Sequence, residues 1–205
     1  MKKFALIAAS FFAFATLASA QMGMSQDKSK RPSPPASAEC KFSGGGTTVL
    51  PGTTVLPGTT ILGGSGGTIK IDYSSPRAKG RKIFGAASEK ALVPYGEIWR
   101  TGANEATTFV TDTNLTVGGK AVPAGSYTIF TIPRADKWTL IINKKNAEWG
   151  IPYKYEADEL ARVDMRVAKT AAPVENFTIA FDPAGSKCTL RLEWENTRAS
   201  VDITK

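Results

Sequence analysis

The most informative feature of this 205-residue chain is an absence, because it contains no histidine. A chain without histidine has no Ser-His-Asp or Cys-His catalytic group, no histidine ligand for zinc and no histidine general base. Any catalysis would depend on carboxylates, lysine, tyrosine or arginine. The absence therefore favours a non-catalytic protein over an enzyme, and we expect no cofactor.

Long apolar runs are also scarce. One lies at the N-terminus, where two lysines precede an apolar stretch over residues 4–17 and a small-residue cleavage site follows at residues 18–20. This order is typical of a secretory signal peptide over residues 1–20, and the stretch is short for a membrane span of about 20 residues. We therefore expect an exported protein, periplasmic or extracellular, with no membrane span after signal removal. A retained N-terminal anchor is the alternative.

The charge balance is basic. The formal net charge of +8 falls to +6 without the signal peptide, which carries two lysines and no acid. A basic balance can indicate a nucleic-acid partner, an anionic envelope surface or only solubility. Export and the spread of the positive charges favour solubility, and we expect no nucleic-acid partner.

Cysteine is rare, with one residue at position 40 and one at position 188. Strand alternation places Cys40 on one face with Ala38 and Phe42, and Cys188 on one face with Leu190. Both thiols therefore point to an apolar side, and an oxidising compartment favours a disulfide between them. Two buried free thiols are the alternative. Two cysteines without histidine make a poor metal site, so we expect no metal.

The N-terminal part of the mature chain has little regular pattern. Residues 21–38 are polar and proline-bearing, which is typical of a flexible spacer. Three hexads of the type Thr-Thr-Val-Leu-Pro-Gly follow within glycine-rich flanks. We interpret them as an insert at about residues 43–67 of a single β-sandwich domain that spans residues 39–205.

From residue 67 onward the hydrophobic period is two, which indicates strands. In one run Tyr127 and Ile129 lie on one face while Phe130 and Ile132 lie on the other, so this strand is expected to be buried on both sides. Turn sequences rich in glycine and proline separate the runs. The fold predicted is all-β, an antiparallel β-sandwich or jelly-roll-like double sheet with very little helix. Residues 86–91 and 156–161 are the segments that could hold a helical turn.

One segment, residues 75–105, breaks the period and concentrates unusual residues. Loops on a rigid scaffold commonly carry binding groups, and we expect a pocket for a glycan or a small anion here. The candidate ligand-binding residues combine forked cationic donors, aromatic walls and polar orienting groups: Arg81, Arg100, Tyr95, Trp99, Asn104 and Glu105. The alternative is a crossover between sheets, with Trp99 in the core and a buried or half-buried Arg100 bonded to Glu105 or to loop carbonyls.

Three further interpretations stay open. Glu97 and Glu105 are catalytic candidates for a carboxylate-based hydrolase of polysaccharide, which needs a carboxylate separation of roughly 5–10 Å. Trp149, Tyr153 and Tyr155 form an aromatic segment that would either stack on a sugar or anchor its own loop. A structural or protein-interaction domain without a small ligand is the third possibility.

Several longer motifs resemble a known family. They lie at residues 80–85, 93–107, 117–127, 138–143 and 192–197, and the first two include Gly-Arg-Lys-Ile-Phe-Gly and Val-Pro-Tyr-Gly-Glu-Ile-Trp-Arg-Thr-Gly-Ala-Asn-Glu. The chain from about residue 67 to its end resembles the bacterial domain-of-unknown-function family 2911. The resemblance implies an exported, β-rich domain and supplies no reaction. The hexads depart from the family pattern, which implies a peripheral insert.

Overall fold

The structure, a computed structural model, describes residues 27–43, 66–146 and 149–205. The expected signal peptide (residues 1–20) and most of the hexad insert lie outside the described residues. Eleven strands contain most of the described chain: β1 (Pro35–Lys41), β2 (Thr68–Ser74), β3 (Phe84–Gly85), β4 (Val93–Pro94), β5 (Thr107–Thr111), β6 (Leu115–Val117), β7 (Lys120–Val122), β8 (Gly125–Ile132), β9 (Lys137–Asn143), β10 (Glu159–Ala184) and β11 (Lys187–Thr204).

Helix is confined to three short 3₁₀ turns among the described residues: η1 (Lys28–Lys30), η2 (Ala87–Glu89) and η3 (Glu156–Asp158). The second and third lie inside the two segments in which the sequence predicted a helical turn. None of the helices in the described ranges has the length and apolarity needed to cross a membrane.

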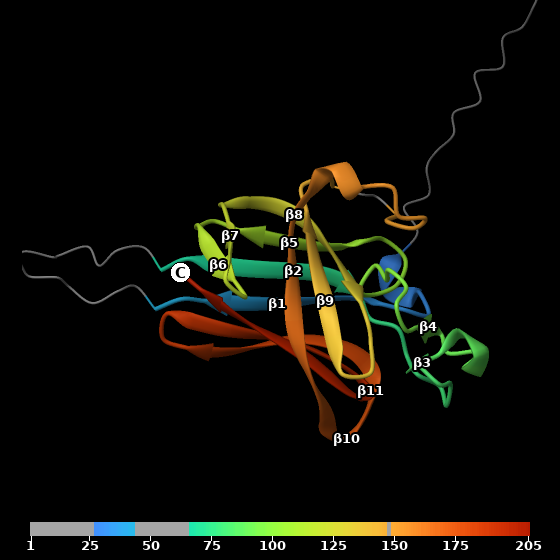
Figure 1. Cartoon of the computed structure of the whole chain (residues 1–205). Coiled ribbons are helices and arrows are strands. Elements are labelled where there is room, and N and C mark those ends of the chain that lie inside the picture. Colours follow the sequence, from blue (N-terminus) through green and yellow to red (C-terminus); the bar gives the residue numbers. More distant parts are fainter. Residues whose placement is uncertain (1–26, 44–65, 147–148) are drawn as a thin grey trace, which may run out of the picture.

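Nine strands form one antiparallel sheet in the order β1-β2-β5-β8-β9-β10-β11-β6-β7, while β3 and β4 form a small parallel pair. The sheet curls until its first strands meet the long β10–β11 hairpin (Figure 1). Beyond β2, the Ala78 amide donates to the Glu175 carbonyl at 2.8 Å, and the Phe177 amide donates to the Pro76 carbonyl at 2.8 Å. The expected all-β, sandwich-like double layer is therefore confirmed, although most of its strands belong to one continuous hydrogen-bonded sheet.

Strand β8 is buried on both faces, as its sequence indicated. Tyr127 and Ile129 belong to the main core, whereas Phe130 and Ile132 belong to a second cluster on the opposite face of the strand. Alternate residues of a strand point to opposite faces, so one apolar run serves two cores. The second cluster includes Ile141 of β9. The loop that follows β9 covers this cluster.

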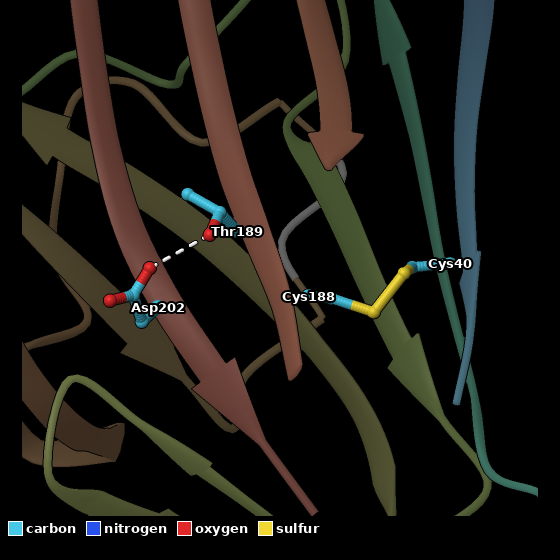
Figure 2. Close-up of a disulfide and its surroundings, with 4 residues drawn as sticks. All are labelled: Cys40, Cys188, Thr189 and Asp202. Atoms are coloured by element: carbon cyan, nitrogen blue, oxygen red, sulfur yellow. Dashed lines mark hydrogen bonds between the residues drawn. A yellow bond between two sulfur atoms is a disulfide. The ribbon is translucent and has the colours of Figure 1, made fainter. Parts of the chain in front are cut away.

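The predicted disulfide is confirmed in the structure. Cys40 of β1 is bonded to Cys188 of β11, with a Cα–Cα separation of 6.5 Å (Figure 2). Both residues are buried in the main core. Next to the bond, the Thr189 hydroxyl donates to the Asp202 carboxylate at 2.8 Å. The bond therefore joins the edge strand of the sheet to the hairpin that closes the second layer.

The segment expected to be a flexible spacer contains ordered structure in its described part. β1 begins at Pro35, within the segment expected to be a spacer. The Ser75 amide donates to the Pro34 carbonyl at 2.9 Å, and Arg31 makes an ion pair with Glu105 at 2.8 Å. Proline and charged residues suggested a spacer, but here Pro34 contacts the loop that follows β2 and Arg31 contacts the segment before β5.

Candidate functional site

Trp99 is fixed between the main core and the surface. Its backbone exchanges two hydrogen bonds with Thr131 of β8, at 2.8 and 2.9 Å, where β5 no longer pairs with β8. Its ring stacks on Trp194 with centroids 5.8 Å apart and an interplanar angle of 20°. Neighbouring side chains then alternate, so Ile98 packs against the second cluster. Trp99 therefore packs against the main core, as the sequence-based alternative expected.

A rigid turn follows Trp99. The indole N–H donates to the Gly102 carbonyl at 2.9 Å, and the Thr107 hydroxyl donates to the buried Thr101 carbonyl at 2.8 Å. A side chain at Gly102 would meet the Ser74 carbonyl at 3.0 Å, so the close approach favours glycine. Asn104 has a φ of +56°, a conformation that asparagine tolerates better than most residues. The turn therefore presents the Asn104 carbonyl in a fixed direction.

Arg100 is half-buried and points along this turn. Its guanidinium donates to the Asn104 carbonyl and lies 5.1 Å from the ring centroid of Trp149. Burial lowers the pKa of the guanidinium from its ordinary value, yet an arginine remains protonated in proteins. No carboxylate of the described residues pairs with it, whereas the sequence had offered Glu105 as a partner. The charge is therefore held by a carbonyl and an aromatic face, and part of its donor capacity remains unused.

Trp149 reaches Arg100 because the loop between β9 and β10 is anchored at its base. The buried Asn143 amide donates to the Tyr153 hydroxyl at 3.1 Å and to the Tyr155 carbonyl at 2.7 Å. Both tyrosine rings pack on Phe130. Burial, together with the neighbouring Glu159, raises the pKa of Tyr153 above its usual range. These tyrosines therefore anchor the loop, and the more exposed Trp149 is the aromatic residue presented to solvent.

An open cavity of about 370 Å³ lies beside Arg100. This volume falls in the range of small-ligand pockets, which is about 300–1,000 Å³. Four of the six candidate binding residues line it: Arg81, Trp99, Arg100 and Asn104. We call it the Arg100 cavity. The structure adds Trp149, Leu92 and Ser33 to its walls, and Ser33 comes from the segment expected to be a spacer.

Arg81 approaches the same cavity from the loop before β3. Its guanidinium donates to the Ala78 carbonyl at 3.0 Å and to the Arg77 carbonyl at 2.6 Å. Within the part of the chain that the structure describes, it has no carboxylate partner. Like Arg100, it is thus oriented by backbone carbonyls and keeps its positive charge uncompensated by an ion pair.

Two of the predicted binding residues do not line the Arg100 cavity. Tyr95 is 38% exposed in the turn after β4. Glu105 lines a separate cavity of about 170 Å³, where Arg31 contacts its carboxylate at 2.8 Å and Lys28 at 3.3 Å. The hydrogen bond from Arg31 lowers the pKa of Glu105 to about 2. Glu105 is therefore ionised at neutral pH and ties the N-terminal segment to the turn that carries Asn104.

The proposed catalytic pair does not face a common cavity. Glu97 is exposed beside β4 and is not among the residues around the cavity that holds Glu105. Glu105 is also engaged by two cations and, with its lowered pKa, is a poor proton donor at neutral pH. The geometry thus gives this pair no acid and base arrangement around one substrate position.

A larger cavity of about 450 Å³ adjoins Arg81, but its character is different. Glu175 and Glu195 line it together with Arg81 and Lys82, so it presents charges of both signs. It contains no aromatic side chain. The Arg100 cavity combines unpaired cations with aromatic faces, and we therefore take it as the candidate ligand site.

Comparison with known families identifies the chain. A family model described as "Protein of unknown function (DUF2911)" matches residues 58–203, which cover β2 to β11 and the whole Arg100 cavity except Ser33. The match begins nine residues before the expected start and confirms the resemblance seen in the sequence. Comparisons with curated proteins and with solved structures found no match. The chain therefore belongs to the DUF2911 family.

Proposed function

We propose that this chain is an exported, non-catalytic binding protein and that a carbohydrate or a small anion occupies the Arg100 cavity. The observation that carries the proposal is Arg100, a half-buried cation that opens on the cavity without a carboxylate partner among the described residues. A planar guanidinium suits bidentate binding of a carboxylate or phosphate. Trp99 and Trp149 supply the aromatic surfaces that ligand pockets commonly contain.

The sequence supports the other two parts of the proposal. Residues 1–20 have the pattern of a secretory signal peptide, and the Cys40–Cys188 disulfide is compatible with an oxidising compartment. The chain has no histidine to act as a general base near the cavity. Binding without chemistry is therefore the function that these features favour.

A thermal-shift panel of neutral sugars, uronic acids, phosphate and small carboxylates tests the proposal. We expect at least one member to raise the melting temperature by about 5–10 °C at a hundredfold excess over its Kd, because a ligand stabilises only the folded state. Arg100→Gln should abolish the shift, since glutamine cannot present the charged fork. The same variant should lose about 1–2 kcal/mol of stability with the bond to the Asn104 carbonyl.

Arg134→Gln is the matched control, because Arg134 is an exposed arginine in the turn between β8 and β9, outside the cavity. It should retain both the stability and the ligand-induced shift of the wild type. A shift that survives in Arg100→Gln would reject the cavity as the site. If no member of the panel raises the melting temperature of the wild type, ligand binding is rejected and a protein-interaction domain is favoured.

A further inference from the structure

A second open cavity continues from the Arg100 cavity. It has a volume of about 280 Å³ and is lined by Pro32, Ser33, Arg77, Lys79 and Arg81. Ser33 and Arg81 line both cavities. The Ser33 carbonyl also accepts a hydrogen bond from the Asn104 side chain at 3.0 Å, which holds the N-terminal segment against the turn that follows Trp99. The two cavities thus form one elongated depression bordered by the N-terminal segment.

The depression is lined by four cations, which we call the cationic track: Arg77, Lys79, Arg81 and Arg100. Ala78 is buried in the main core, whereas Arg77 and Lys79 on either side of it are exposed. None of the four side chains is paired with an acid in the described ranges, although many other surface charges are. No carboxylate of the described chain lines the depression itself, so the four positive charges attract an anion along its length.

Acidic side chains beside the cationic track exclude one path for a bound anionic chain. Glu175 and Glu195 line the 450 Å³ cavity that shares Arg81 with the depression. The Glu175 carboxylate accepts a hydrogen bond from the Lys79 backbone amide at 2.9 Å, so it is held on that side. An anionic chain is repelled there, and the favourable path runs from Arg100 past Arg81 to Lys79 and Arg77.

We infer that the ligand is a carboxylated glycan chain that lies along the cationic track. One uronate residue occupies the Arg100 cavity, with its carboxylate on Arg100 and its ring against Trp149, and the carboxylates of the following residues lie near Arg81, Lys79 and Arg77. This inference rests on the proposed function and specifies its ligand class. Polyphosphate matches the cations equally well, but it has no ring to cover the exposed faces of Trp149 and Leu92, which are 56% and 44% exposed.

Titration calorimetry with galacturonate and its dimer, trimer and tetramer tests the inference. We expect the tetramer to bind the wild type about tenfold more tightly than the monomer at moderate salt, because two or more exposed charge pairs are added. In the Arg77→Gln/Lys79→Gln variant, the monomer affinity should stay within about twofold, and most of the gain with length should disappear. Lys120→Gln/Arg134→Gln removes the same charge from other exposed sites and should keep that gain.

The outcomes separate this inference from the proposed function. Equal binding of monomer and tetramer by the wild type would overturn the track while leaving the Arg100 site intact. The track is also overturned if the methyl-esterified tetramer, which keeps the rings but not the charges, binds as tightly as the free acid. Tighter binding of tripolyphosphate than of the trimer would overturn the glycan assignment. Failure of every ligand in the thermal-shift panel would overturn the proposed function itself.

Discussion

Replacing Cys40 with alanine is expected to lower the free energy of unfolding by about 2–5 kcal/mol. The bond closes a chain segment with a sequence separation of 148 residues, and its loss frees the unfolded chain from that constraint. It also releases β1, an edge strand that pairs only with β2 in the sheet order. Urea unfolding monitored by circular dichroism measures the change, with the far-ultraviolet spectrum expected to retain the all-β form.

Cys188→Ala and the double variant provide the internal control. Each single variant removes the same covalent bond, so the three proteins should be destabilised to within about 1 kcal/mol of one another rather than additively. Additive losses would assign the effect to packing of the individual side chains. Wild-type stability in either single variant would contradict a structural role for the bond.

Trp194→Ala is expected to cost about 3–5 kcal/mol of stability. Trp194 is 1% exposed, stacks on Trp99 and contacts Phe84 and Phe177 in the aromatic cluster of the main core. Its indole N–H donates to the Glu175 carbonyl at 3.1 Å, and truncation leaves that carbonyl without this partner. Because Trp99 loses the ring on which it stacks, the wall of the Arg100 cavity should loosen as well.

Trp149→Ala is the matched substitution, with the same change of side chain at a position that is 56% exposed. We expect a loss of less than about 1 kcal/mol in urea melts, since little packing is removed. Because the substitution is the same at both positions, the difference in stability between the two variants reports the effect of burial. Similar stabilities for Trp194→Ala and Trp149→Ala would show that the aromatic cluster does not stabilise the core.

The parts of the fold that follow from local alternation could be predicted from the sequence. The period of two placed Cys40 and Cys188 on apolar faces and showed that β8 is buried on both sides, and both predictions are confirmed. Alternation specifies which face a side chain occupies, and it says nothing of which strands are hydrogen-bonded neighbours. The alternation could therefore not predict that the two layers share one continuous sheet.

The candidate site was predictable only in part, because its remaining contacts join distant segments. The glycines, the arginines and the single tryptophan of residues 75–105, where the period of two breaks, pointed to four of the cavity residues. The partner of Glu105 is Arg31, which lies 74 residues away in a segment whose composition suggested a spacer. Trp149 was recognised as an aromatic of a separate loop, but its position beside Arg100 depends on how Asn143 anchors that loop through Tyr153 and Tyr155.

The central claim, that the Arg100 cavity binds the ligand, is tested most directly by the indole N–H signals of the four tryptophans during an NMR titration with galacturonate. Trp149 and Trp99 line the cavity, whereas Trp138 is 1% exposed within the core and is not among its walls. We expect the Trp149 and Trp99 signals to move together and to saturate at one ligand concentration while the Trp138 signal stays in place. A Trp149 signal that does not move at ligand concentrations that saturate the thermal shift, or a Trp138 signal that moves as far as that of Trp149, would contradict binding in this cavity.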